Sequence, residues 1–284
     1  MKRISIPVLV AVCVFAALVS GQQAPKDQWA KYDGGKVHYY DVGPRKKQAI
    51  VLIHGWTCSA DLWNASLSAF PEYRVIAVDL PGHGQSDKPK TTYSMEYFAR
   101  SIDAVMKAAK VKRSVLVGHS MGTPVARQFY RLFPTETLGV VIVDGPLKAI
   151  APKAQMESFL GPMRTDFKTN GTKMIQGLLA GVKDETLRKK IGDVMLATPE
   201  HVAISAMDGM ADDSIWGGDK ITVPTLAIMN ADGPWPKNVE ETYRTIAPNL
   251  EFHKFTDVSH FLFMEKPKEF NDSIRGFVVK NKLL

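Results

Sequence analysis

Cysteine is scarce in this sequence, and its scarcity limits how the protein can be stabilised. The 284 residues contain two cysteines, Cys13 and Cys58. Cys13 lies in an N-terminal segment that we predict to be removed, which leaves Cys58 alone and excludes an intramolecular disulfide framework. The stability of the folded chain must therefore come from a buried core, for which this length is sufficient.

Repeats, low-complexity tracts and clustered charge are also missing. No repeat of 20 to 50 residues and no heptad pattern is present, which excludes solenoids and coiled coils. The net charge is +7 and the pI is about 9.2, but no basic run is interleaved with aromatic residues. We therefore expect no nucleic-acid partner. With 45% apolar and 23% charged residues, the chain has the composition of an ordinary globular protein.

One long apolar run stands at the N-terminus. Lys2 and Arg3 precede the apolar stretch 4–19, which ends in the small residues Ser20 and Gly21. This order predicts a cleaved secretory signal over residues 1–21 and a secreted or periplasmic protein without stable membrane association. A retained membrane anchor is the alternative, but the stretch is short for a span and no basic residues follow it directly.

Short β-rich runs alternate with helical patterns along the rest of the chain. Several runs are apolar at every position, as expected of strands that helices cover on both faces. This alternation predicts an α/β fold with a mostly parallel central sheet and helices on both faces. The expected strands are 36–42, 49–54, 74–80, 114–118, 139–144, 225–229 and 251–255.

The β pattern disappears between residues 146 and 218. Helical segments broken by glycine and proline replace it, and they contain six of the twelve methionines. We interpret 146–218 as a helical cap inserted between core segments 22–145 and 219–284. Methionine is common in helical cores, and it also suits the roof of an apolar pocket.

The strongest chemical signal is the motif Gly118-His119-Ser120-Met121-Gly122. It follows an apolar strand pattern and precedes a helical one. A serine in this sharp turn projects its hydroxyl from the edge of the sheet, and the flanking glycines let strand and helix approach closely. The motif therefore predicts Ser120 as a catalytic nucleophile.

Acyl transfer at Ser120 also requires donors for an oxyanion. The backbone amide of Met121 begins the following helix, where the helix dipole favours negative charge. The amide of Trp56, in the loop after strand 49–54, can face Ser120 across the sheet edge. We predict that Trp56 and Met121 form the oxyanion hole.

Among seven histidines, His260 is the expected general base because it lies in a loop after the last predicted strand. An acid must orient its ring, and the usual chain order is serine, acid, histidine. Asp232 and Asp144 both follow strands and precede His260. We favour Asp232 and keep Asp144 as the alternative acid.

Four motifs together resemble the α/β-hydrolase superfamily: His54-Gly55-Trp56, the run from Asp79 to Asp87, the Ser120 turn, and Val258-Ser259-His260-Phe261. The resemblance covers about residues 30–280 and implies an esterase-like serine hydrolase with a helical cap. Related epoxide hydrolases and dehalogenases carry aspartate where this chain has Ser120. One departure affects the acid: relatives usually place glycine and two residues before it, whereas Asn230-Ala231-Asp232 is one residue shorter.

The expected function is cleavage of a carboxylic ester or lactone of a small to medium apolar substrate through an acyl-enzyme. We expect no cofactor and no metal, because the sequence holds neither a dinucleotide loop nor a metal-ligand cluster. The partner is a small ester-like molecule. Carbon–carbon bond hydrolysis and cofactor-free perhydrolysis would use the same triad, and a non-catalytic ligand-binding receptor is the alternative from another class.

Overall fold

The computed structural model describes residues 25–284. The predicted signal segment 1–21 lies outside these residues, so its cleavage and the export of the protein stay predictions. Within the described part of the chain, no helix combines the length and the apolar character needed to cross a membrane.

An eight-stranded sheet forms the centre of the molecule, in the order β1-β2-β4-β3-β5-β6-β7-β8. β1 and β2 pair antiparallel, as do β2 and β4, and all other neighbours are parallel. This confirms the predicted α/β fold. The strands are β1 (Asp27–Tyr32), β2 (Gly35–Val42), β3 (Gln48–Ile53), β4 (Val75–Val78), β5 (Arg113–His119), β6 (Thr137–Val143), β7 (Thr225–Asn230) and β8 (Leu250–Phe255).

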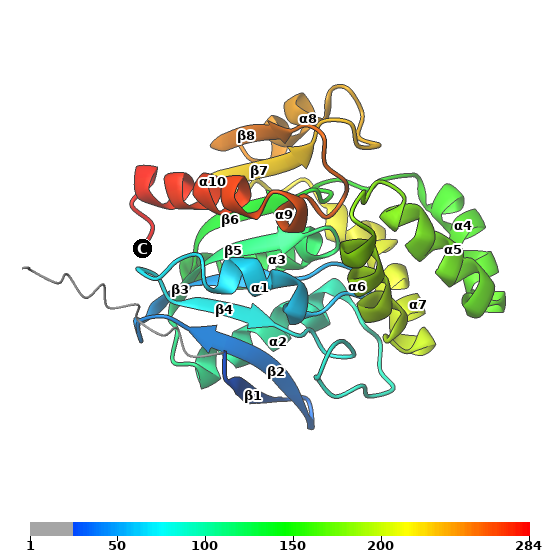
Figure 1. The fold of residues 1–284 in the computed structure, drawn as a ribbon, viewed down its shortest axis with the longest axis horizontal. Helices are drawn as coiled ribbons and strands as arrows, with labels where there is room; N and C mark the ends of the chain where they lie inside the picture. The colour runs from blue at the N-terminus through cyan, green and yellow to red at the C-terminus, as the bar shows by residue number, and fades with distance from the viewer. Residues whose placement is uncertain (1–24) are drawn as a thin grey trace, which may run out of the picture.

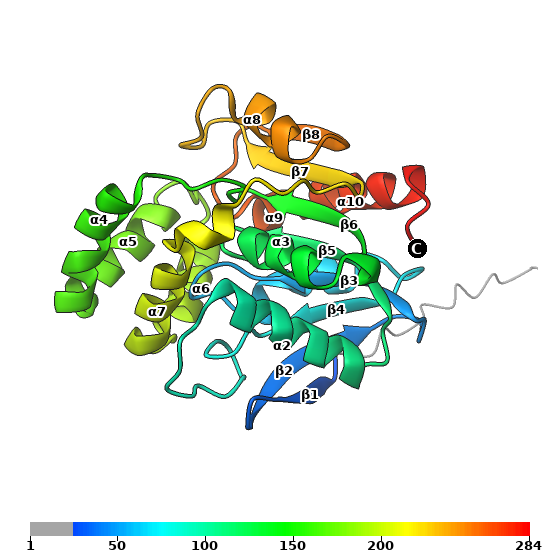
Figure 2. The same cartoon turned by 180° about the vertical axis from the view of Figure 1, so that it is seen from behind.

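Helices cover both faces of this sheet. Figure 1 shows α1, α9 and α10 on one face, and Figure 2 shows α2, α3 and α8 on the other. The helices are α1 (Asn64–Leu67), α2 (Met95–Ala108), α3 (Gly122–Leu132), α4 (Lys153–Thr165), α5 (Phe167–Leu179), α6 (Glu185–Leu196), α7 (Glu200–Met210), α8 (Val239–Ile246), α9 (Leu262–Glu265) and α10 (Pro267–Lys280), with short 3-10 turns η1 (Ala60–Trp63), η2 (Pro134–Glu136) and η3 (Asp213–Trp216).

Four helices, α4 to α7, lie between β6 and β7 in the chain, and we call them the cap helices. They lie beyond the ends of the strands to which the strand arrows point (Figure 1). The Trp56 indole donates a hydrogen bond to the carbonyl of Ala203 in α7 (2.8 Å), and Thr198 Oγ1 donates to the carbonyl of Thr57 (3.1 Å). The cap helices therefore rest on the loop that follows β3.

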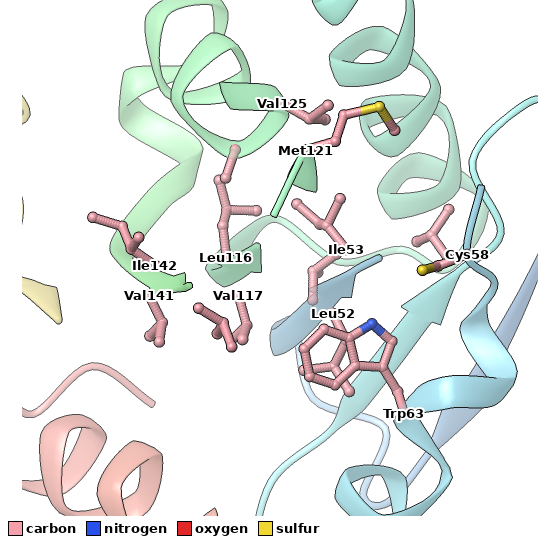
Figure 3. Packing of buried hydrophobic residues seen from close by; sticks show 14 of the residues in the cluster. Leu52, Ile53, Cys58, Trp63, Leu116, Val117, Met121, Val125, Val141 and Ile142 are labelled. Carbon is pink, nitrogen blue, oxygen red and sulfur yellow. The ribbon is translucent and has the colours of Figure 1, made fainter. Parts of the chain in front are cut away.

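The core is built from strands that bury both of their faces. Leu116 and Val117 are neighbours in β5, and both are fully buried. Because successive strand side chains point to opposite faces, Leu116 lies on the side of Val125 and Val117 on the side of Trp63 (Figure 3). The continuous apolar runs of the sequence thus correspond to the middle of the sheet.

Candidate active site

Ser120 lies in the sharp turn between β5 and α3. Its φ of 52° is in the left-handed region, which is strained for a residue with a Cβ atom. The turn is held by hydrogen bonds from the Ser120 amide to the carbonyl of Val143 (3.0 Å) and from the Thr123 amide to the carbonyl of Ser120 (2.9 Å). The geometry is that of a nucleophile elbow.

The two glycines of the motif allow this close packing. A Cβ atom at Gly118 would lie 2.3 Å from the carbonyl oxygen of Gly122, and one at Gly122 would lie 2.4 Å from the carbonyl oxygen of Ile53. Both distances are shorter than any allowed contact, so a larger residue at either position would push α3 away from β3 and β5. The glycine spacing of the motif is thereby explained by backbone contact.

The loop after β3 lies directly against Ser120. A Cβ atom at Gly55 would be 3.0 Å from Cβ of Ser120, so the amide of the next residue, Trp56, is in the immediate surroundings of the serine. Within residues 25–284, no backbone acceptor occupies the amide of Trp56 or of Met121. The two donors predicted for an oxyanion are thus available at this end of the sheet.

His54 braces the same loop. Its Nε2 accepts a hydrogen bond from the Leu80 amide (3.0 Å), which leaves Nδ1–H to donate to the carbonyl of Gly55 (2.8 Å). Burial lowers the pKa of His54, so the neutral ring required by this bonding pattern is favoured.

His260 is paired with Asp144. Its Nδ1 lies 2.7 Å from Oδ2 of Asp144, whose side chain is 2% exposed, while the His260 side chain is 18% exposed. Asp144 follows β6 directly and, like Ser120, has a positive φ, of 42°. A buried carboxylate at this distance selects the imidazole tautomer with the proton on Nδ1, which leaves Nε2 free to accept a proton.

The expectation that Asp232 contacts His260 was wrong. Asp232 is exposed, and its amide donates to Oδ1 of Asn230 (2.9 Å) within a tight turn. This turn carries the Asp232 side chain into solvent, whereas the carboxylate of Asp144 is buried at the end of the neighbouring strand. The alternative acid is the one that the structure brings to His260.

Among the described residues no direct hydrogen bond joins Ser120 to His260, and the contact between their two segments is made by His119. The ring of His119, the residue before Ser120, packs against the His260 ring with 4.7 Å between centroids. Catalytic hydrogen bonds are often long in unliganded enzymes and tighten when substrate binds. The arrangement is therefore compatible with proton transfer from Ser120 to His260.

His119 and Glu265 support the histidine loop, and sequence reasoning missed both roles. His119 Nε2 is 2.9 Å from the carbonyl of His260, and Glu265 Oε2 accepts bonds from the amide and the hydroxyl of Ser259 (both 2.6 Å). Burial, followed by the nearby charge of His260, lowers the pKa of His119 well below 6.5, so its neutral ring donates from Nε2. Neither contact has a sequence signal, because each joins segments distant in the chain or on opposite sides of a turn.

Among residues 25–284, no group of three or more histidine, cysteine, aspartate or glutamate side chains is arranged to hold a metal ion. A cavity of about 220 Å³ lies beside the loop between β7 and α8, and Asn230, Trp235 and Phe252 contribute to its lining. Ser120 does not line this cavity.

Comparison with known proteins identifies a family for this chain. Residues 48–192 match the model of the alpha/beta hydrolase fold. The non-heme chloroperoxidase of Streptomyces lividans is 40% identical over 115 residues, covering 39% of this chain and 42% of that protein. The chain thus spans less than half of this relative.

Two further similarities extend over most of the chain. The 2-hydroxy-6-oxononadienedioate/2-hydroxy-6-oxononatrienedioate hydrolase of Paraburkholderia phymatum is 29% identical over 273 residues, covering 86% of this chain and 91% of the relative. The solved structure of Est816, described as an N-acyl homoserine lactone degrading enzyme, has a TM-score of 0.72 and 28% identity, covering 88% of this chain and 100% of its own. Because the family model spans just over half of the sequence, the chain belongs to the α/β-hydrolase family.

Proposed function

We propose that the protein is a serine hydrolase that cleaves carboxylic esters or lactones of small to medium apolar substrates. The observation that carries this proposal is the 2.7 Å contact between His260 and the buried Asp144, next to the strained turn of Ser120. A serine and an acid after the adjacent strands β5 and β6, with a histidine in the loop after β8, form the unit that activates a hydroxyl for acyl transfer.

In this mechanism Nε2 of His260 takes the proton of Ser120 as Oγ attacks the carbonyl carbon. The Trp56 and Met121 amides donate to the oxyanion of the tetrahedral intermediate, which expels the alcohol with the proton from His260. Water then attacks the acyl-enzyme, His260 accepts its proton, and the carboxylic acid leaves as Ser120 regains a proton. Asp144 stabilises the imidazolium in both halves of the reaction.

The preference for an apolar substrate is supported by the cap helices. Four methionines of the cap helices are buried: Met163, Met195, Met207 and Met210. Phe261 is buried beside His260. Flexible thioethers can adapt to apolar groups of different shape, whereas a charged acyl group would lose its hydration next to them.

Carbon–carbon bond hydrolysis is the second candidate. The Paraburkholderia phymatum relative, which covers most of the chain, is named for hydrolysis of a 2-hydroxy-6-oxo dienedioate. The shorter similarity to a chloroperoxidase favours perhydrolysis in the same way, by attack of hydrogen peroxide in place of water on the acyl-enzyme. We further propose that the protein acts outside the cytoplasm, as the N-terminal segment predicts.

Ester turnover by purified protein tests the proposal. p-Nitrophenyl esters with acyl chains of two to ten carbons should be cleaved, with an optimum at medium length and little turnover of charged analogues. Ser120→Ala should lower kcat by roughly 10⁴- to 10⁶-fold, since the lost group is the nucleophile. Ser273→Ala makes the same chemical change at a partly exposed site in α10 and should leave kcat unchanged.

The outcomes separate the candidates. If Ser120→Ala retains wild-type turnover, Ser120 is not the nucleophile. If the wild-type protein binds apolar esters without cleaving them, the receptor function is favoured, and cleavage of a dienoic 2-hydroxy-6-oxo acid in preference to all esters favours carbon–carbon bond hydrolysis.

A further inference from the structure

We propose that Trp235 is a positioning residue that orients the carboxylate of Asp144 toward His260 through its indole N–H. The proposal rests on the serine hydrolase function above. It gives a role to the loop between β7 and α8, which contains Asp232, the acid favoured from the sequence.

The two oxygens of Asp144 have different partners. Oδ2 faces Nδ1 of His260 at 2.7 Å. Oδ1 accepts from Nε1 of Trp235 at 2.7 Å and from the amide of Asn230 at 3.0 Å. Both donors on Oδ1 belong to the segment at the end of β7, so this segment holds one oxygen and leaves the other for the histidine.

A carboxylate needs such donors to keep a single orientation. Rotation about its terminal torsion is broad and nearly two-fold, so packing alone selects the orientation poorly. The side chain of Asp144 is 2% exposed, so water cannot take the place of a missing donor at low cost. The indole N–H is the one side-chain donor to Oδ1 among the described residues, and its geometry is that of a strong charge-assisted hydrogen bond.

The indole is also well placed to be rigid. A Cβ atom at Gly233 would be 3.1 Å from Cδ1 of Trp235, so the backbone of the loop packs on the ring. Trp235 also contributes to the lining of the cavity of about 220 Å³, and Asp144 is not among the lining residues. Trp235→Phe removes the N–H and keeps an aromatic ring in that position.

The rate at which an alkyl fluorophosphonate labels Ser120 provides the readout. In this reaction Oγ of Ser120 bonds to phosphorus, fluoride leaves and His260 takes the serine proton, so the rate reports the activation of Ser120 without knowledge of the natural substrate. Trp235→Phe should slow labelling by about tenfold to a hundredfold, as expected for loss of a hydrogen bond to a charged group. With an ester substrate, the same variant should lower kcat and leave KM nearly unchanged.

A double-mutant cycle distinguishes positioning from general destabilisation. If Trp235 acts through Asp144, Trp235→Phe added to Asp144→Asn should slow labelling by less than about twofold further. If Trp235→Phe slows labelling by the same factor in the wild type and in Asp144→Asn, the proposal is overturned. Trp29→Phe, at an exposed tryptophan of β1, is the matched control and should label like the wild type.

A second variant keeps the test decisive if Trp235→Phe unfolds. Trp235→His retains a ring N–H and should label faster than Trp235→Phe or Trp235→Leu. Equal rates in all three variants would show that the N–H has no role. If wild type and Ser120→Ala label alike, the proposed function fails. If the wild type labels, Ser120→Ala does not, and Trp235→Phe labels as fast as the wild type, this inference alone fails.

Discussion

At the scale of residues, the candidate site depends on two left-handed positions at the ends of adjacent strands. Ser120 directly follows β5 and has a φ of 52°, and Asp144 directly follows β6 and has a φ of 42°. These conformations are unfavourable for residues with a Cβ atom, and they persist where the surrounding structure holds them. Here the Ser120 amide is bonded to Val143 and the Asp144 amide to Ile228, each on the neighbouring strand. The sheet therefore supports the strain that aims both side chains at the site.

The identity of the acid leads to the first residue-scale prediction. Asp144→Asn should lower kcat by roughly three to four orders of magnitude with little change in KM, because the amide favours the wrong imidazole tautomer. Steady-state kinetics on the best p-nitrophenyl ester measures this loss.

Asp232→Asn is the matched control, because it makes the same change at an exposed strand-end aspartate. It should keep kcat within about twofold of wild type, in keeping with the small effect of most surface substitutions. A large loss in Asp232→Asn together with a mild one in Asp144→Asn would contradict the assignment of the acid.

At the scale of elements, α3 links the nucleophile to the cap helices. Ser120 precedes its first turn, and the fully buried Arg127 lies near its middle. Arg127 donates to the carbonyl of Leu147, where the chain leaves the core, and to the carbonyl of Gly217, where it returns. Arg131 reaches the same return segment through the carbonyl of Ile215 (2.6 Å) and the carboxylate of Asp219. One helix thus holds both connections of the cap.

This arrangement predicts a structural cost for Arg127→Met, which keeps the apolar stem and removes the guanidinium. The carbonyl of the buried Leu147 and the carbonyl of the exposed Gly217 lose charge-assisted donors, so the free energy of unfolding should fall by about 2 to 4 kcal/mol. Urea titration followed by circular dichroism measures it, and limited proteolysis should cut first near residues 146–152 or 217–220.

Arg100→Met serves as the comparison. Arg100 forms a half-exposed i,i+4 pair with Glu96, and such pairs contribute at most about 1 kcal/mol. Equal losses of stability in the two variants would mean that the cap connections do not depend on Arg127.

At the scale of the whole molecule, buried histidines couple stability to pH. Burial lowers the pKa of His54, of His119 and, with the charge of His54, of His83, whose pKa falls to about 3. Burial also acts to lower the pKa of His38, but the hydrogen bonds and charges of Asp79 and Asp27 outweigh it and raise that pKa above 6.5. The three histidines whose pKa is lowered and His38, whose pKa is raised, change the stability with pH in opposite directions.

The sign follows from the protons bound in each state. Histidines with lowered pKa bind protons in the unfolded chain first, so their contribution to stability is present above pH 6.5 and is lost as the pH falls below it. His38 contributes stability below pH 6.5 that is lost as the pH rises through its folded pKa. Between about pH 6 and 5 His38 is protonated in both the folded and the unfolded chain and adds little to the slope. The three histidines with lowered pKa therefore predict that the free energy of unfolding falls by up to about 4 kcal/mol per pH unit in this range, since each contributes at most about 1.4 kcal/mol.

Urea titrations from pH 8 to 5 measure this dependence. His83→Gln removes one of the three groups and should reduce the slope by about 1.4 kcal/mol per pH unit, whatever its effect on stability at pH 8. If the free energy of unfolding depends on pH equally in His83→Gln and in the wild type, His83 does not contribute to the pH dependence.

Most of the sheet could be predicted from the sequence. Seven expected strands agree with β2 to β8 to within a few residues, and the interior strands among them have apolar runs buried on both faces. β1 was missed. It is an edge strand whose residues alternate between exposed and partly buried, and its sequence Asp-Gln-Trp-Ala-Lys-Tyr carries little apolar character. Its place is set by antiparallel pairing with β2, which a local pattern does not reveal.

The sequence alone determined the elbow of Ser120, since a serine between two close-packed glycines after a buried strand requires that turn. It also favoured His260 as the candidate base through its place after the last strand. Which aspartate serves His260 was decided only by the tertiary structure. Asp144 and Asp232 follow neighbouring parallel strands and are equivalent in chain order. The buried donors on Oδ1 of Asp144 and the exposed turn around Asp232 distinguish them, and both arise from contacts between segments far apart in the chain.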